Sequence, residues 1–237
     1  MTKKHETIKD STEEVFSFNE SLRPQIEKIM ARYPADLVYI ATTDYAMHSY
    51  GTEELESSEH MSILDDALGD LVETHSDVTV LVTADHGMSA KSRMVDLKAA
   101  LAGHGIRSNP VSVIKDRYVV HHSNLGGSIF VYLEEAEVEL ALKVLRDTPG
   151  VEEALPRCQA AARLRLHSDR IGDILVTGER DVVFGTPSEV AMPPGLRSHG
   201  SRHECRVPLI GYNGDFRDFS FEENRDMGRF VFERVLA

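Results

Sequence analysis

Two short apolar runs dominate the hydrophobic pattern of the first half of the chain, and an aspartate follows each of them. Residues 37–42 precede Asp44, and residues 78–83 precede Asp85. Runs of this length without polar alternation are typical of strands buried on both faces. Residues 58–73 carry apolar side chains at helical spacing, which predicts a helix whose apolar face comprises Met61, Leu64, Leu68 and either Leu71 or Val72. We therefore expect a parallel strand–helix–strand unit with both aspartates at the same sheet edge.

The apolar runs become shorter after residue 103 and change between helical and strand periodicity. Breakers such as Pro149-Gly150 mark where they end. The expected helices cover residues 20–31, 95–102, 137–146, 156–166 and 224–235. The expected strands cover residues 118–121, 128–133 and 207–211, with a hairpin of residues 173–176 and 181–184 around Gly178.

Together these elements predict an α/β fold with a mainly parallel sheet sandwiched between helices. Short mixed elements interrupt this pattern between residues 105 and 192, so we expect them to form an inserted, cap-like α+β subdomain. The breaker Pro193-Pro194-Gly195 follows the insertion. On this interpretation, the core comprises residues 1–104 and 193–237, and the subdomain comprises residues 105–192.

Length, charge and hydropathy exclude several classes of protein. A chain of 237 residues can bury a sizeable core. Its formal net charge of −13 argues against a nucleic-acid or anionic-membrane surface. No apolar run approaches the roughly 20 residues of a membrane-spanning helix, and the polar start is not that of a signal peptide. We expect a soluble protein without nucleic-acid or membrane partners.

The two cysteines, Cys158 and Cys205, show no metal-binding spacing. Reduced thiols in a cytoplasmic protein are the simplest interpretation, and we expect Cys205 to be buried because a predicted strand follows it.

Several side chains suited to metal binding follow the predicted strands. Asp44 and His48 are four residues apart, Asp85 and His86 are adjacent, and His199 lies in a loop before the last strand. Ligands in open α/β sheets bind beyond the carboxyl ends of the strands, and carboxylate with imidazole suits zinc. Each pair alone could equally be a helix cap beside a structural histidine. Their joint placement favours a two-metal centre, because clustered carboxylates are costly without a cation.

The remaining histidines and arginines have weaker signals. His203 follows His199 by four residues, and we expect it to support the site or face solvent. Arg197 and Arg202 flank the same loop and could either bind an anion or be solvated. The other histidines are expected at strand ends, at the surface or in caps: His60, His75, His104, His121, His122 and His167.

The motifs Asp44-x-x-x-His48, Thr83-Ala84-Asp85-His86-Gly87-Met88 and Ser198-His199-Gly200 resemble the metal-binding motifs of the alkaline phosphatase superfamily. The branch is that of the nucleotide pyrophosphatases, phosphodiesterases and phosphonoacetate hydrolases. Similarity to the phosphonoacetate hydrolases extends to Asp116–His122, Asp169–Asp173 and Leu196–Gly200, and it covers the chain from about residue 16 onward.

This resemblance implies a zinc-dependent hydrolase that cleaves the C–P bond of phosphonoacetate to acetate and phosphate. Asp44, His48 and His199 would bind one Zn²⁺, and Asp85 with His86 would supply half of a second site. The implied partner is a small anionic phosphonate or phosphoester.

The chain also departs from the family pattern. The family begins with a strand that provides another metal-binding Asp and then a Thr nucleophile, whereas residues 1–18 contain no such pattern and Asp10-Ser11-Thr12 lies in a polar run. We therefore expect no catalytic nucleophile in this chain and a separate N-terminal portion as a partner, with a homodimer left open. The alternatives are a phosphodiesterase or nucleotide pyrophosphatase of the same superfamily, or a catalytically dead metal-binding protein.

Overall fold

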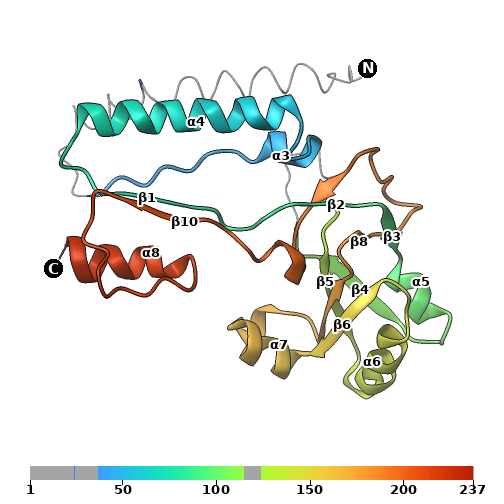
Figure 1. Ribbon diagram of the computed structural model, residues 1–237. Coiled ribbons are helices and arrows are strands. Elements are labelled where there is room, and N and C mark those ends of the chain that lie inside the picture. The colour runs from blue at the N-terminus through green and yellow to red at the C-terminus, as the bar shows by residue number, and fades with distance from the viewer. Residues whose placement is uncertain (1–23, 25–36, 115–123, 237) are drawn as a thin grey trace, which may run out of the picture. The chain divides into compact units, whose positions relative to one another are not determined.

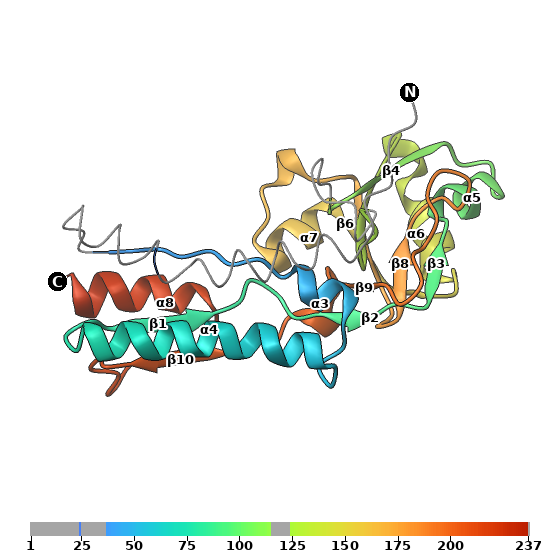
Figure 2. The same ribbon diagram turned by 90° about the horizontal axis from the view of Figure 1, so that it is seen from above.

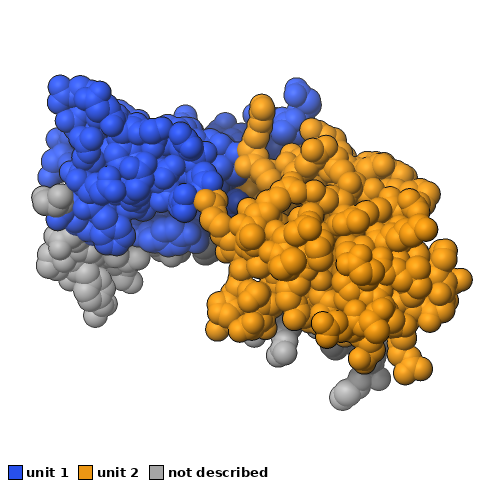
Figure 3. All heavy atoms as spheres, turned by 90° about the horizontal axis from the view of Figure 1, so that it is seen from below, with its two compact units in different colours: residues 1–85, 207–237 blue, residues 86–206 orange. Residues whose placement is uncertain are grey.

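The computed structural model describes residues 24, 37–114 and 124–236, which form two compact units. Unit 1 comprises residues 1–85 and 207–237, and unit 2 comprises residues 86–206 (Figure 3). Apart from residue 24, the helix predicted at residues 20–31 lies outside the described residues, and so does the strand predicted at residues 118–121.

Unit 1 contains a two-stranded antiparallel ladder of β1 and β10, in which Val82 faces Ile210. The two strands run side by side in both ribbon views (Figure 1, Figure 2), and α4 and α8 lie on opposite sides of the ladder in Figure 1. The final helix continues into a π-helical turn, and together they cover almost all of the helix predicted at residues 224–235. The elements of unit 1 are α3 Tyr45–Ser49, α4 Leu55–Thr74, β1 Val80–Thr83, β10 Leu209–Tyr212, α8 Arg225–Phe230 and η4 Val231–Val235.

The strand predicted at residues 37–42 is wrong. This segment has no regular secondary structure, and its Tyr39 side chain is 88% exposed. Among the described residues, β1 pairs with β10 in antiparallel fashion, so the expected parallel strand–helix–strand unit is also absent there. An apolar run becomes a strand only where a neighbouring strand satisfies its backbone polar groups, and no described strand pairs with residues 37–42.

The helix predicted at residues 58–73 is confirmed as α4, which begins three residues earlier, at Leu55. Its apolar face was predicted incorrectly at one position, because Met61 is 56% exposed. The buried side chains of α4 are Ser57 and His60, which are three residues apart and so share a face. Small and polar residues therefore face the interior here, and His60 is not a surface residue as expected.

Unit 2 is built on an antiparallel sheet of four strands in the order β4-β5-β7-β6. Alternate residues of β7 point to opposite faces, as strand geometry requires. Ile174 and Val176 pack into one apolar cluster with α5 and α6, whereas Leu175 packs into a second cluster with Ala160 of α7. The sheet is thus covered on both faces. The helices and strands of this layered part are α5 Leu97–Ala102, β4 Ser108–Ser112, β5 Ser128–Leu133, η1 Glu135–Glu137, α6 Val138–Arg146, β6 Val151–Pro156, α7 Arg157–Leu164, η2 Ser168–Arg170 and β7 Ile174–Gly178.

Two smaller ladders complete unit 2. β2 pairs with β9 in antiparallel fashion, and β3 pairs with β8 in parallel. The hairpin predicted around Gly178 is wrong, because β7 pairs with β5 and β6 while β8 pairs with β3. The remaining elements are β2 Ser89–Ala90, β3 Arg93–Val95, β8 Val182–Phe184, β9 Arg197–Ser198 and η3 Arg202–Glu204.

The expected α/β class is confirmed, and so are most of the expected elements of unit 2, including β5 over residues 128–133. Parallel pairing among the described strands is confined to β3 with β8, whereas a mainly parallel sheet was expected. The cap-like subdomain at residues 105–192 stays a prediction, since the two compact units reflect local packing and divide the chain elsewhere. No helix of the described residues is both long and apolar enough to cross a membrane.

Candidate metal centre

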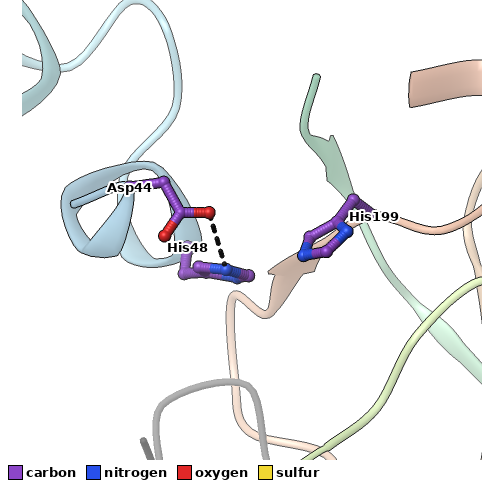
Figure 4. Close-up of side chains that lie close together, drawn as sticks. All are labelled: Asp44, His48 and His199. Atoms are coloured by element: carbon purple, nitrogen blue, oxygen red, sulfur yellow. Dashed lines mark ion pairs between the residues drawn. The ribbon is translucent and has the colours of Figure 1, made fainter. Parts of the chain in front are cut away.

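The first candidate ligands lie in unit 1, at the start of the short helix α3. Asp44 occupies the N-cap position but makes no side-chain capping hydrogen bond. Its Oδ2 atom instead lies 3.3 Å from Nε2 of His48, one helical turn later (Figure 4). His48 is buried, while half of the Asp44 side chain remains exposed. The helix therefore presents a carboxylate and an imidazole together, with the carboxylate accessible to a cation.

Beside this pair lies His60, which sequence reasoning did not associate with the site. Burial lowers the pKa of His60, against the opposing effects of the Asp44 charge and a hydrogen bond with the backbone of Thr43. His60 is thus a neutral imidazole in the interior of unit 1 that holds the segment carrying Asp44 against α4. The sequence signal is slight, because His60 differs from a surface histidine only by its spacing from Ser57.

Asp85 and His86 follow β1 as the sequence predicts, and the boundary between the two units falls between them. Asp85 is exposed and His86 is half-buried. Nδ1 of His86 lies 3.0 Å from the carbonyl oxygen of Gly87. Since a carbonyl only accepts, this nitrogen must donate, so Nε2 carries the lone pair of the neutral ring. A metal-binding histidine is commonly oriented in this way by a backbone carbonyl.

His199 lies in the loop after β9 in unit 2, and the backbone on both sides of it is constrained. Ser198 is fully buried and donates a hydrogen bond to the carbonyl of Leu125, at 2.6 Å. The carbonyl of His199 itself accepts the N–H of Gly127, at 2.8 Å. Gly200 then has a φ of +109°, a conformation that favours glycine. These contacts hold the loop that presents the His199 ring.

The rings of His86 and His199 are stacked within unit 2. Their centroids are 3.4 Å apart and their planes differ by 10°. The stack fixes how the two rings lie relative to each other within unit 2. The structure thus brings together Asp44 with His48 in one unit and His86 with His199 in the other.

A buried ion pair contacts the segments of unit 2 that carry His86 and His199. Nζ of Lys91 is 3.1 Å from Oε1 of Glu204, and both side chains are almost completely inaccessible to solvent. Burial lowers the pKa of Lys91. Burial opposes ionisation of Glu204, but hydrogen bonds from Ser89 and Ser201 and the charge of Lys91 outweigh it and lower the pKa of Glu204. Sequence reasoning missed this pair, although Ser201-x-x-Glu204 is a capping-box motif that the structure forms.

Other side chains near His199 are occupied by structural contacts. Arg202 pairs with Glu152 of β6, and Nε2 of His203 lies 3.0 Å from the same carboxylate. Arg197 contacts the carbonyl of Met88 at 3.5 Å. Cys205 is exposed and not buried as expected, because the residue after η3 points outward while Glu204 fills the interior.

The donor types suit a divalent metal ion. Asp44, His48 and His199 each offer one ligand atom, a carboxylate oxygen or an imidazole nitrogen, and this mixture is typical of catalytic zinc. The described residues of this α/β protein thus offer donor groups of the kind found in metal-dependent proteins.

Residues 6–203 match the family described as type I phosphodiesterase / nucleotide pyrophosphatase. The match covers most of the chain and includes every candidate ligand, so the chain belongs to this family.

Solved structures with the same fold include phosphonoacetate hydrolase from Sinorhizobium meliloti 1021 in complex with phosphonoacetate. Its TM-score is 0.73 at 28% sequence identity, with 83% of this chain and 50% of that chain covered. The complex of the same enzyme with phosphonoformate gives the same TM-score at 29% identity and the same coverage.

Murine ectonucleotide pyrophosphatase / phosphodiesterase 5 has a TM-score of 0.53 at 18% identity, covering 90% of this chain and 54% of that chain, which shows the fold alone. These neighbours confirm the alkaline phosphatase-like fold and are hydrolases. The chain spans about half the length of the solved structures that it matches.

Proposed function

We propose that this chain carries the zinc ligands of a phosphonoacetate hydrolase-like enzyme, which cleaves the C–P bond of phosphonoacetate to acetate and phosphate. The observation that carries the proposal is the joint occurrence of two features. The fold matches a phosphonoacetate hydrolase at 28% identity, and the chain retains Asp44, His48, Asp85, His86 and His199 in the motif positions.

In this proposal, Asp44, His48 and His199 bind one zinc ion, and Asp85 with His86 contributes to a second site. Two contacts, one within each unit, support the proposal. Asp44 and His48 already approach each other within 3.3 Å, and the Nδ1 donation of His86 leaves Nε2 as its lone-pair nitrogen. A bound zinc would supply electrostatic stabilisation for the negative charge of a phosphonate.

The residues of this chain would bind the metal ion and orient its ligands. The Asp44 carboxylate would donate an oxygen lone pair to the cation, and its contact with buried His48 would orient it. The stacked rings of His86 and His199 would present two imidazole groups in a fixed relative orientation. Residues 1–18 contain no apolar run that ends in Asp or leads into a Thr, and no residue of the chain is proposed as the nucleophile.

A second candidate is phosphodiesterase or nucleotide pyrophosphatase activity. It is favoured by the family match over residues 6–203 and by the fold shared with the murine ectonucleotide enzyme. A catalytically dead metal-binding protein is the third candidate, because the ligands are present without a nucleophile motif.

Phosphate release from phosphonoacetate, measured at matched zinc concentration, separates these candidates. We expect no meaningful release by the 237-residue chain alone, and we expect release when a polypeptide carrying the family's Asp and Thr motifs is supplied in cis or in trans. Hydrolysis of a nucleotide diester without release from phosphonoacetate would favour the second candidate, and zinc binding without either reaction would favour the third. Turnover by the chain alone at about 1 s⁻¹, typical of working enzymes, would contradict the proposal.

A further inference from the structure

The Lys91–Glu204 pair is unusual because both charged side chains are buried, with exposed fractions of 0% and 1%. Removing two charges from water is costly, and a buried salt bridge often adds little net stability over apolar residues of similar size. Stability alone therefore gives a weak reason for the pair. Its hydrogen bonds indicate another role.

Glu204 bonds to both histidine-bearing segments of unit 2. Its Oε2 atom accepts the backbone N–H of Ser201 at 2.9 Å and the Ser201 hydroxyl at 2.7 Å. Its carbonyl oxygen accepts the N–H of Gly87 at 2.7 Å. Ser201 is two residues after His199, and Gly87 directly follows His86. One residue thus fixes the backbone beside both stacked rings.

Lys91 extends the same network. Nζ donates to the carbonyl of Arg180 at 2.7 Å as well as to Glu204. Its backbone N–H donates to the carbonyl of Leu196, at the start of the segment that leads through β9 to His199. The ammonium group therefore holds the Glu204 carboxylate at a defined distance from β2, while its own backbone holds the approach to the His199 loop.

The close approach at Gly87 shows how little space this arrangement leaves. A Cβ atom on Gly87 would lie 3.2 Å from the carbonyl oxygen of Arg206 and 3.3 Å from that of Glu204. Both neighbours are backbone atoms, which cannot move aside as a flexible side chain can. The segment after His86 is therefore set by its distance to the Glu204 backbone.

We propose that Lys91 and Glu204 form a positioning pair that sets the relative placement of the His86 and His199 rings, and thereby the affinity of these rings for metal. The part of this inference that concerns metal rests on the proposed function. The part that concerns ring placement stands on the contacts within unit 2 alone.

The test compares three variants of the 237-residue chain. Lys91→Met combined with Glu204→Gln removes both charges together, so no uncompensated charge is left in the interior. Ser201→Ala removes one hydrogen bond to Glu204 and keeps both charges. Arg157→Met combined with Asp173→Asn is the control, a more exposed ion pair of the same unit. This pair also lies in unit 2, with Nη2 and Oδ1 2.7 Å apart, and it bonds to Gly172 and Leu133 and not to the histidine segments.

Two measurements are made on each folded variant. Imidazole resonances in long-range ¹H–¹⁵N spectra of the zinc-free protein report the ring stacking, and calorimetric titration with Zn²⁺ reports affinity. We expect the Lys91/Glu204 double variant to shift the His86 and His199 resonances and to weaken zinc binding about 10- to 100-fold, the range found for residues that orient metal ligands. We expect a smaller change in the same direction for Ser201→Ala and none for the control.

Unchanged ring resonances in the folded double variant would overturn the inference, as would an equal shift in the control. If the double variant does not fold, the Ser201→Ala variant provides the test. Unchanged His86 and His199 resonances in that variant would overturn the inference. A wild-type chain that binds no zinc, combined with shifted rings in the variants, would refute the proposed metal function and leave the positioning role supported.

Discussion

The two units differ in how they bury their apolar residues. In unit 2, β5, β6 and β7 send alternate side chains into apolar clusters on both faces of a four-stranded sheet. In unit 1, the two-stranded ladder leaves Ile210 and Tyr212 of β10 more than half exposed. The buried apolar residues described in unit 1 are Ala46, Met227 and Phe230. An apolar strand sequence is thus buried only where further strands and helices cover it.

The remainder of unit 1 depends on more local contacts. Phe230 packs against Phe216 and Phe219, with ring centroids 4.9 and 5.1 Å away. Asp226 accepts the backbone N–H groups of Glu222 and Glu223, each at 2.9 Å. Unit 1 is therefore stabilised by an aromatic cluster and by hydrogen bonds that Asp226 accepts from the backbone before its C-terminal helix, whereas unit 2 is stabilised by a layered core.

The largest expected difference between the units concerns core truncation. Phe184 of β8 is 2% exposed within the main cluster of unit 2, and Phe184→Ala should lower the free energy of unfolding by about 3–5 kcal/mol. The control Tyr39→Ala, in the exposed segment of unit 1, should change it by less than about 0.5 kcal/mol. Urea unfolding, with amide hydrogen exchange to locate the effect, measures both. Equal losses for the two variants would show that residues 37–42 are packed in solution.

The next effect concerns the metal ligands, one taken from each unit. His48→Ala and His199→Ala should each weaken zinc binding by at least about 100-fold, because loss of a direct ligand should exceed the 10- to 100-fold loss from its supporting partners. His203→Ala is the control, since His203 pairs with Glu152. Calorimetric titration gives affinity and stoichiometry. Wild-type binding by either ligand variant would confine the site to one unit and refute the joint assignment.

A smaller effect is expected for the buried histidine of unit 1. His60→Leu removes the hydrogen bond to the backbone of Thr43 and should weaken zinc binding about tenfold, because the segment carrying Asp44 loses its attachment to α4. His75→Leu, at the C-cap of the same helix, serves as the control. The same titration measures both variants, and equal affinities would mean that His60 only fills space.

The smallest effect concerns acid stability of unit 1. Hydrogen bonds from the Glu222 and Glu223 backbone lower the pKa of Asp226 to about 2. A lowered pKa stabilises the folded state above the unfolded value of about 3.9, and this contribution disappears as the pH falls through about 2. Asp226→Asn should therefore lower stability at neutral pH and reduce its decline between about pH 4 and pH 2.

Urea unfolding across this pH range measures the effect. Asp215→Asn is the matched comparison in unit 1, where the Asp215–Arg217 pair is exposed and screened by solvent, so its effect should be weaker. A decline with pH that is unchanged in Asp226→Asn would contradict the assigned role of Asp226.

The sequence alone determined the candidate ligands and most of unit 2. Spacings such as Asp44-x-x-x-His48 depend on covalent neighbours, and α3 places those two side chains together because residues four apart share a helix face. β5 and α6 were predicted correctly because their own residues carry the strand and helix periodicities. The ligand spacing, β5 and α6 depend on residues that are close in the sequence, so the sequence pattern is enough to predict them.

The tertiary structure decided the features that depend on distant neighbours. Residues 37–42 have the composition of a buried strand, but no described strand pairs with them, and periodicity carries no information about pairing. His60 and the Lys91–Glu204 pair are buried although their residue types are usually exposed, because the segments around them supply hydrogen bonds and opposite charge from positions as far as 113 residues away. Burial of a polar group is a property of its partners, and only the folded chain shows which partners it meets.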